Sequence, residues 1–354
     1  MRQIGFFLLL IGLLAACNSK SDQSAPAPNP ASTKTCLSIF ALESIRTSGF
    51  EGALIKDYAK KFNCAVSLTL FPTMPELVKA LIAKENDGDI DVVLNMDNCF
   101  ALEDTLKGRF LPLNAIAKNE LSRDLYLDPN TTFIPYAYAN LGIIYNEKVF
   151  DSPPQSFGEL QDAKYFRQMA ICDPHQSGLG RATLYWTLAL FGDFGYEHLW
   201  QSLRKNVKKV YDSPQQALEA LKKGECSMMI GFNSTPAWLE ELNQSDKYFK
   251  TSMLKEGSYQ YSESAAIHAQ TRNESVARHF IEYLISTEAQ KMAIYKLGLF
   301  PANSKTNLPM RFARIPLSSW TVNKRLSEDQ IRTELPVWLY FWDSLFNYGI
   351  AFAD

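Results

Sequence analysis

Short apolar runs alternate with segments of helical periodicity along most of the chain. The runs have the length and content of buried strands, and the segments between them repeat apolar residues every three or four positions. The predicted strands lie at 37–41, 65–71, 91–94, 136–145, 168–172, 210–211, 227–231 and 259–268. The predicted helices lie at 50–62, 74–84, 181–190, 200–207, 214–223, 274–286, 288–297, 328–335 and 336–346, and 102–113 covers the first sheet. Alternation of strands and helices predicts an α/β fold with a parallel sheet.

The order of these elements predicts one α/β unit into which a second is inserted. Chain crossings near 132–138 and 260–268 would connect the units, so that 36–134 and 266–354 form lobe 1 and 135–265 forms lobe 2. The length of 354 residues suits about two domains. Ligands in open α/β sheets bind outside the carboxyl ends of the strands. Two such edges that face one another make a cleft that closes on its ligand.

The stretch 226–242 combines a strand end, a turn and a helix start. Thr235 has the residue type of an N-cap, and Pro236 then takes the first helical position. Such a helix directs its free N–H groups back toward the strand end, which suits anionic or acceptor-rich ligands.

Two aromatic residues, Phe232 and Trp238, flank the polar part of this turn. The polar residues between them are Asn233, Ser234 and Thr235. Aromatic walls around a few hydrogen-bonding groups suit a flat, polar small molecule. The alternative is an ordinary strand-to-helix turn whose two aromatic side chains belong to the core.

Other predicted strand ends also carry polar residues. Ser177 follows Gln176 and precedes two glycines, so it is expected to cap a helix that a ligand can approach; a plain helix cap is the alternative. Asp97, with Asn98, offers a carboxylate that neutralises a cationic ligand or caps a helix. Thr73, Asp212 and Glu43 also follow predicted strands and are expected at the ligand-binding edge of the sheet. Four tyrosines either line the hinge or pack in the core: Tyr136, Tyr138, Tyr259 and Tyr261.

The chain start predicts export and lipidation. Arg2 precedes an apolar run at 4–14 that is too short for a normal membrane-spanning helix. Leu14-Ala15-Ala16-Cys17 resembles a bacterial lipobox, so 1–16 is predicted to be a signal peptide and Cys17 to carry lipid; an uncleaved anchor is the alternative. The polar segment 17–35 reads as a flexible tether. The folded part is therefore expected outside the cytoplasm, anchored to a bacterial membrane.

Charge and cysteine content exclude several classes of protein. The formal net charge of −2 gives no reason to expect a nucleic-acid partner. Cysteines after the lipobox are Cys36, Cys64, Cys99, Cys172 and Cys226; the first two can form a disulfide if the first two strands are parallel neighbours. No Cys-x-x-Cys pair and no paired histidines occur, so neither a metal nor a cofactor is expected. Ser177 does not lie in the Gly-x-Ser-x-Gly turn of a hydrolase.

An ordered series of motifs resembles the periplasmic thiamine-binding proteins of ABC transporters. The motifs are Asp91-Val92-Val93-Leu94 with Asp97-Asn98; Thr132-Phe133-x-Pro135 with Tyr138 and Tyr145; Pro153-Pro154-Gln155-Ser156; Asp173-Pro174 before Gly178-Leu179-Gly180; Lys223-Gly224-Glu225 before Pro236-Ala237; and Glu256-Gly257-x-Tyr259-x-x-x-Glu263-x-Ala265-Ala266. The resemblance covers the chain after the tether. It implies a two-lobe type II binding-protein fold with a hinge and a central ligand cleft. It also implies no catalysis, and delivery of thiamine or its phosphates to a membrane permease.

The resemblance also implies where the ligand binds. Phosphate and polar contacts fall at Thr73, Met74, Gln176, Ser177 and 232–235, and Trp238 matches a tyrosine that lines the pocket. Two family tryptophans are missing, because Asp212-Ser213-Pro214 (with Tyr211 nearby) and Gly298-Leu299-Phe300 stand in their places. Thr73-Met74 replace an Asp-Gly pair.

We therefore expect a monomeric, lipid-anchored receptor that closes on thiamine or a thiamine phosphate and serves a permease with a separate ATPase. Asp97 or Glu43 would offset the thiazolium charge. Phe232 and Trp238, with Tyr211 and Phe300, would sandwich the pyrimidine ring. The alternatives are a receptor for a polyamine, an organophosphonate or ferric iron, and an extracellular hydrolase that uses Ser177 or Ser234.

Overall fold

The computed structural model describes residues 36–84, 88–114, 120–128, 130–243 and 248–346. Cys17 and the rest of the predicted signal peptide and tether lie outside these residues, so those assignments stay predictions. Within the described residues, no helix has both the length and the apolar content needed to cross a membrane.

Lobe 1 is built on the three strands that the sequence predicts near its start. Strand β1 pairs in parallel with β2 on one side and with β3 on the other. These strands are β1 Leu37–Leu42, β2 Val66–Phe71 and β3 Val92–Asp97. The helices of this lobe are α1 Ser44–Thr47, α2 Lys56–Lys61 (after a π-helical turn at Glu51–Ile55), α3 Met74–Ala83, α7 Glu274–Leu284 and α8 Thr287–Leu297.

Lobe 2 repeats the same plan with the inserted segment. Strand β5 lies between β6 and β7 and is parallel to both. The strands are β5 Met169–Cys172, β6 Val207–Tyr211, β7 Met228–Phe232 and β8 Phe249–Ser252. The helices are α4 Gly178–Leu203, α5 Pro214–Lys222 and α6 Thr235–Glu241. The sequence predicted two helices at 181–190 and 200–207, and α4 does consist of two helical segments, which are separated at Gly192, where φ is 65° and ψ is −178°.

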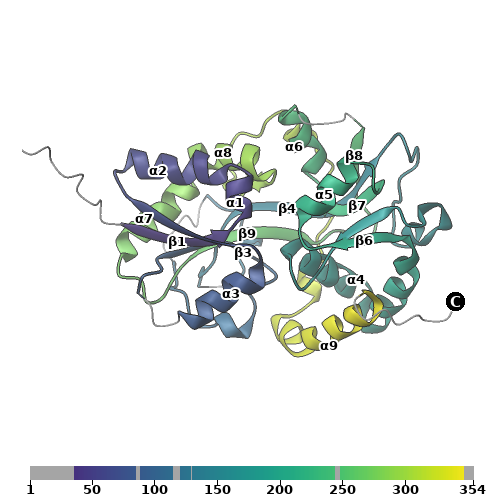
Figure 1. Cartoon of the computed structure of the whole chain (residues 1–354), viewed down its shortest axis with the longest axis horizontal. Coiled ribbons are helices and arrows are strands. Elements are labelled where there is room, and N and C mark those ends of the chain that lie inside the picture. The colour runs from purple at the N-terminus through teal and green to yellow at the C-terminus, as the bar shows by residue number, and fades with distance from the viewer. Residues whose placement is uncertain (1–35, 85–87, 115–119, 129, 244–247, 347–354) are drawn as a thin grey trace, which may run out of the picture. The chain divides into compact units, whose positions relative to one another are not determined.

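Two antiparallel strands run from one lobe to the other (Figure 1). They are β4 Ile134–Asn146 and β9 Gln260–Ile267, which match the two crossings predicted from the sequence. The first half of β4 pairs with β9, and its second half pairs with β7 and β8 in lobe 2. The sheet order is therefore β2-β1-β3-β9-β4-β7-β5-β6. A short strand, β10 Phe300–Pro301, adds to β4 and was not predicted.

The segment 304–326 forms a third crossing that the sequence analysis missed. Its backbone carbonyl at Pro316 accepts a hydrogen bond from Asn233, and Arg311 forms an ion pair with Glu241 of α6. Further on, the Trp320 indole donates to the carbonyl of Glu256. Most of this segment is irregular, so no periodic pattern marked its path.

The C-terminal helix departs from the prediction in two respects. α9 Glu328–Phe346 is one helix that contains Pro336, where the sequence predicted a break at the proline. It packs on α4 of lobe 2: the Tyr196 hydroxyl donates to the Trp338 carbonyl, and the Trp200 and Trp342 rings lie 5.0 Å apart. This packing stabilises the helix across Pro336. It also argues against placing α9 in lobe 1, as the predicted boundaries 266–354 would do.

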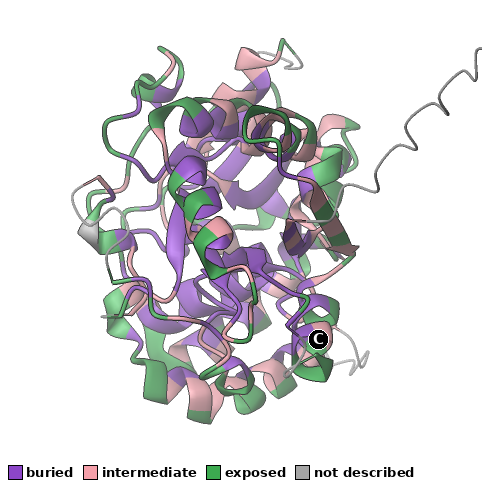
Figure 2. Ribbon diagram, turned by 90° about the vertical axis from the view of Figure 1, so that its left-hand side faces the viewer, coloured by how far each residue is buried: buried purple, intermediate pink, exposed green. Residues whose placement is uncertain are grey.

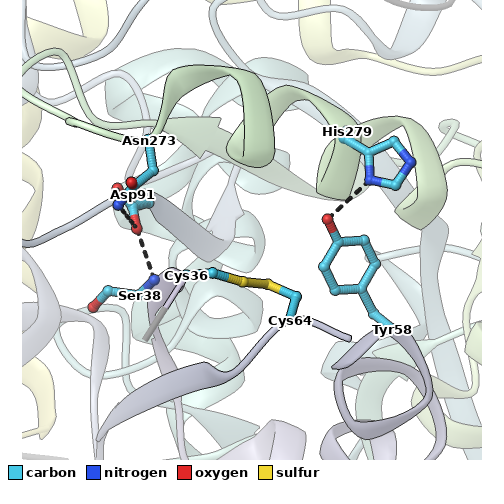
Figure 3. The surroundings of a disulfide bond; sticks show 7 residues. All are labelled: Cys36, Ser38, Tyr58, Cys64, Asp91, Asn273 and His279. Carbon is cyan, nitrogen blue, oxygen red and sulfur yellow. Dashed lines mark hydrogen bonds between the residues drawn. A yellow bond between two sulfur atoms is a disulfide. The ribbon is translucent and has the colours of Figure 1, made fainter. Parts of the chain in front are cut away.

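Burial follows the strands of both lobes. In Figure 2 the strands are largely purple, and the outer faces of the helices are green. Cys36 and Cys64 form the disulfide that the sequence allowed, because β1 and β2 are parallel neighbours (Figure 3). Cys99, Cys172 and Cys226 are free and buried.

Candidate ligand-binding site

A cavity of about 390 Å³ lies between the two lobes, beside the crossing strands. Lobe 1 contributes the ends of β1 and β3 and the start of α3, and lobe 2 contributes the starts of α4, α5 and α6. Strand β9 and the end of α8 complete the wall. These are the strand edges at which the sequence analysis placed the ligand.

Most of the predicted site residues line this cavity. They are Thr73, Met74, Asp97, Gln176, Ser177, Asp212, Phe232, Thr235 and Trp238. Four predicted residues are absent from the lining: Asn98, Tyr211, Asn233 and Ser234. Glu43 and Phe300 are also absent from it. Phe300 instead stacks on Tyr138, with ring centroids 5.4 Å apart.

Asn233 and Ser234 are fully buried and serve the fold. The Asn233 side chain accepts from the backbone N–H of Asn140 and donates to the carbonyl of Pro316, so it links β4 to the third crossing. The Ser234 hydroxyl donates to the carbonyl of Gly298 at the end of α8. Their side chains thus form hydrogen bonds within the protein, and neither residue lines the cavity, in contrast to the prediction that they do.

Asn98 and Tyr211 also lie outside the cavity lining. The Asn98 amide donates to the Gln260 carbonyl and its oxygen accepts from the Ser262 N–H, so it ties the end of β3 to β9. Tyr211 is buried and borders a separate surface hollow, where its ring lies 4.9 Å from the Lys209 ammonium nitrogen. Its place at the end of β6 was predicted correctly, but its side chain turns away from the cavity.

The cavity floor carries Asp97, which is only 1% exposed. One carboxylate oxygen accepts hydrogen bonds from the backbone N–H groups of Cys99 and Phe100, each 2.9 Å long. Burial raises the pKa of Asp97 to about 7, more than these two hydrogen bonds lower it. A cation in the cavity would therefore find a carboxylate that is costly to ionise alone.

A second carboxylate, Glu263, lies beside Asp97 as its cross-strand neighbour on β9. It accepts from the Tyr136 hydroxyl at 2.9 Å, the Asn95 amide at 3.1 Å and the Tyr261 hydroxyl at 3.2 Å. Burial raises the pKa of Glu263 as well, against the effect of these three donors. The floor therefore holds two acidic groups close together.

The sequence analysis did not include Glu263 among the site residues. The available indication was a carboxylate between two serines in a strand that continues into an apolar run. Asn95 also contributes to this network: its backbone has a φ of 59°, and the pairing of β3 with β9 is irregular between Val93 and Met96. This local irregularity directs the Asn95 amide toward Glu263.

The starts of α3, α4, α5 and α6 line the cavity. Ser177 caps α4 as predicted, since its hydroxyl accepts from the Gly180 N–H at 3.0 Å. Thr73 is the N-cap residue of α3 but makes no side-chain capping bond. The prediction for α6 was one residue off: the helix begins at Thr235, and Ser234 is its N-cap. Free N–H groups at α3 and α4 are suited to oxygen acceptors of a ligand.

Trp238 lines the cavity while contacting lobe 1. Its indole N–H donates to the Tyr295 carbonyl at 2.8 Å, in the last turn of α8. The ring covers Gly298, the left-handed C-cap of that helix, where a Cβ atom would lie 2.6 Å from Trp238 Cδ2. The Trp238 ring thus occupies the space beside Gly298.

Gly298→Ala should lower the free energy of unfolding by about 1–3 kcal/mol, because Gly298 has a φ of 69° and its added methyl group would overlap Trp238. Urea denaturation followed by tryptophan fluorescence measures the change. Gly52→Ala is the matched control, since nothing lies within 4 Å of its Cβ position. Equal stability of both variants would contradict the proposed overlap.

Two α/β lobes that share crossing strands and enclose a cavity define a two-lobe binding protein. Among solved structures, a periplasmic thiamin binding protein superposes with a TM-score of 0.77 at 22% identity, covering 87% of this chain and 95% of that one. The periplasmic binding protein AfuA from Actinobacillus pleuropneumoniae, with fructose-6-phosphate bound, gives 0.73 at 17% identity over 89% of this chain and 100% of that one. These similarities establish the two-lobe fold.

The sequence comparisons establish the family. The family described as bacterial extracellular solute-binding protein matches residues 53–316, so the chain belongs to that family. The thiamine-binding periplasmic protein of Escherichia coli (strain K12) is 24% identical over 320 residues, which are 88% of this chain and 94% of that protein. The protein of the same name from Brucella abortus biovar 1 (strain 9-941) is 25% identical over 294 residues, 82% of this chain and 86% of that protein.

Proposed function

We propose that this protein captures thiamine or a thiamine phosphate for an ABC importer. The observation that carries the proposal is the acidic floor of the cavity, formed by the buried Asp97 and the half-buried Glu263 beneath apolar walls. An organic cation with aromatic rings suits such a site, because burial strengthens its attraction to a carboxylate. The names of the related proteins from Escherichia coli and Brucella abortus support the same ligand.

The residues divide into three roles in this proposal. Asp97 offsets the thiazolium charge, and Glu263 is held behind it by its three donors. Phe232 and Trp238 provide aromatic surface for the ligand rings. The hydroxyl or phosphate end of the ligand lies toward the helix starts, near Thr73, Met74, Gln176 and Ser177. Asp212 and Thr235 border the same space.

The partners follow from the proposed role. The loaded protein would act as a monomer, dock on a membrane permease, and rely on a separate ATPase for energy. Lipid on Cys17 would hold it at a bacterial membrane, while the tether at 17–35 lets the folded part reach the permease. Mass spectrometry of the mature protein tests the anchor: a diacylglyceryl mass on Cys17 is expected, and a free cysteine would refute lipidation.

Calorimetry with purified protein tests the ligand. We expect sub-micromolar affinity for thiamine or one of its phosphates and much weaker binding of spermidine and 2-aminoethylphosphonate. Mass spectrometry of ligand retained during purification provides an independent identification. Absence of binding to thiamine and its phosphates would remove the ligand assignment and leave the family assignment in place.

Ferric iron is the second candidate, because Tyr136, Tyr261 and Glu263 meet at the cavity floor. Both hydroxyls donate to the carboxylate, and burial raises the pKa of each phenol, which disfavours the phenolates that iron would need. Across the described residues, no group of three or more His, Cys, Asp or Glu side chains is arranged to hold a metal ion. A visible absorption band after exposure to ferric citrate would favour iron; we expect none.

We assign the protein no catalytic role. Ser177 Oγ already accepts the helix-capping hydrogen bond, and the His175 imidazole contacts Asp343 at 2.9 Å. Ser234 is fully buried and donates to a backbone carbonyl. Neither serine thus has the exposed, base-activated hydroxyl of a hydrolase. A fluorophosphonate probe should label neither residue.

When the pH is lowered from 8 to 6, thiamine affinity should fall by up to about tenfold. Asp97 binds a proton below its pKa of about 7, and the cation must displace this proton. The raised pKa means that the ligand-free cavity takes up a proton as pH falls, and ligand binding releases it. Titration calorimetry in buffers of different ionisation enthalpy measures both quantities. Affinity that is constant, or that rises at pH 6, would contradict this role of Asp97.

A further inference from the structure

Asp97 contacts the opposite lobe directly. It ends β3 of lobe 1, and one of its carboxylate oxygens, Oδ2, lies against Gly178, the first residue of α4 in lobe 2. A methyl group at Gly178 would overlap this oxygen and would lie 2.9 Å from Cε2 of Tyr261. The two lobes can therefore meet here because residue 178 has no side chain.

A second contact across the same interface involves Arg181, one turn further along α4. Its guanidinium carbon lies 4.3 Å from the ring centroid of Phe100, and its Nη1 atom lies 3.6 Å from Glu103 Oε1. Both partners follow β3 in lobe 1. Arg181 is 3% exposed, so this side chain is enclosed when the lobes are in contact.

The charges around Asp97 do not balance. The groups that face it are the carboxylate of Glu263, the guanidinium of Arg181, the Cys99 thiol and the hydroxyls of Tyr136, Tyr259 and Tyr261. Arg181 also interacts with Glu103, so this buried cation is shared among three carboxylates. The two lysines that line the cavity, Lys222 and Lys296, are partly exposed. Contact of Gly178 with an ionised Asp97 therefore leaves a buried negative charge uncompensated.

We propose that the Asp97–Gly178 contact makes lobe closure selective for cationic ligands, because the lobes come together only when a positive charge neutralises Asp97. Separation of the lobes would return Asp97 to water, where its ionised form is stable. A ligand cation in the cavity removes the cost of closure, and a bound proton does the same. A neutral ligand of equal shape would fill the cavity without stabilising the closed state. The inference rests on the proposed function only in that the proposed function identifies the cation as thiamine or a thiamine phosphate.

Small-angle X-ray scattering of the ligand-free protein between pH 4 and pH 8.5 tests the inference without any ligand. The wild type should become more compact as pH falls, with a midpoint between the ordinary Asp value of about 3.9 and about 7. Asp97→Asn should be compact over the whole range, since its side chain never ionises. Gly178→Ala should stay expanded at every pH, and the control Gly52→Ala should follow the wild type.

The outcomes separate the two proposals. A wild-type radius of gyration that does not change with pH, or a pH transition that persists in Asp97→Asn, would overturn selective closure. A Gly178→Ala protein that becomes as compact as the wild type would overturn the contact itself; circular dichroism checks that this variant is folded. If the pH transition depends on Asp97 but thiamine does not bind, the proposed ligand is wrong and the charge-dependent closure stands.

Discussion

Asp97→Asn should weaken thiamine binding by about 30-fold or more at pH 8. Removing one member of a buried charge pair costs about 2–5 kcal/mol, and 2 kcal/mol corresponds to a factor of about 30. Asn keeps an oxygen that can accept from the Cys99 and Phe100 N–H groups, so the turn after β3 should retain its conformation. The loss should therefore arise from charge. Titration calorimetry measures it.

The matched control is Asp89→Asn, which makes the same change at a side chain that is 75% exposed. Its charge is screened by water, so affinity should stay within about twofold of the wild type. The two variants together distinguish the effect of the buried carboxylate from the effect of net charge. If Asp97→Asn bound thiamine within threefold of the wild type, the cation would have to bind elsewhere in the cavity.

Removal of the Cys36–Cys64 disulfide should lower the free energy of unfolding by about 3.6 kcal/mol. The two cysteines are separated by 28 positions, and the chain-entropy description assigns about this value to a loop of that length. β2 also forms one end of the sheet order, so its pairing with β1 depends more on this covalent link than an internal strand would. Urea unfolding of Cys36→Ala/Cys64→Ala against the wild type measures the effect.

Reductant provides the control for the disulfide. Wild type in excess dithiothreitol should match the double variant, while the variant itself should be insensitive to reductant. The remaining cysteines, Cys99, Cys172 and Cys226, are buried and unpaired, so they should not contribute to this difference. A loss below about 1 kcal/mol in both comparisons would mean that packing alone holds β2 in place.

Local patterns in the sequence were sufficient for much of the fold. The short apolar runs became β1, β2 and β3, and the residue types before α4 predicted its cap, Ser177. These features depend on neighbouring residues, so a single sequence reveals them. α9 shows the limit: the sequence predicted a break at Pro336, and only packing on α4 explains the continuous helix.

In the candidate site, too, some features follow from local sequence and others depend on residues far away in the chain. The rule that ligands bind at carboxyl ends of parallel strands pointed to edges that border the cavity, and Asp97 and Phe232 line it. It could not say which way a side chain turns. Asn233 faces β4 and the third crossing because partners far away in the sequence satisfy it. Glu263 reaches the floor because two distant donors, Asn95 and Tyr136, hold it there.

Lobe 1 is assembled from two pieces of chain that are widely separated in the sequence. β3 pairs with β9, and the buried carboxylate of Asp91 accepts a hydrogen bond from the Thr271 hydroxyl across a separation of 180 positions (Figure 3 shows Asp91 with Asn273). During synthesis or export from the N-terminus, the first piece of lobe 1 cannot complete its sheet until the second piece has emerged. Most strands of lobe 2 come from one continuous stretch of sequence. Non-local pairing of this kind slows folding. Lobe 2 should therefore acquire protection from hydrogen exchange first, and the cavity should form only when the last strands of lobe 1 have paired.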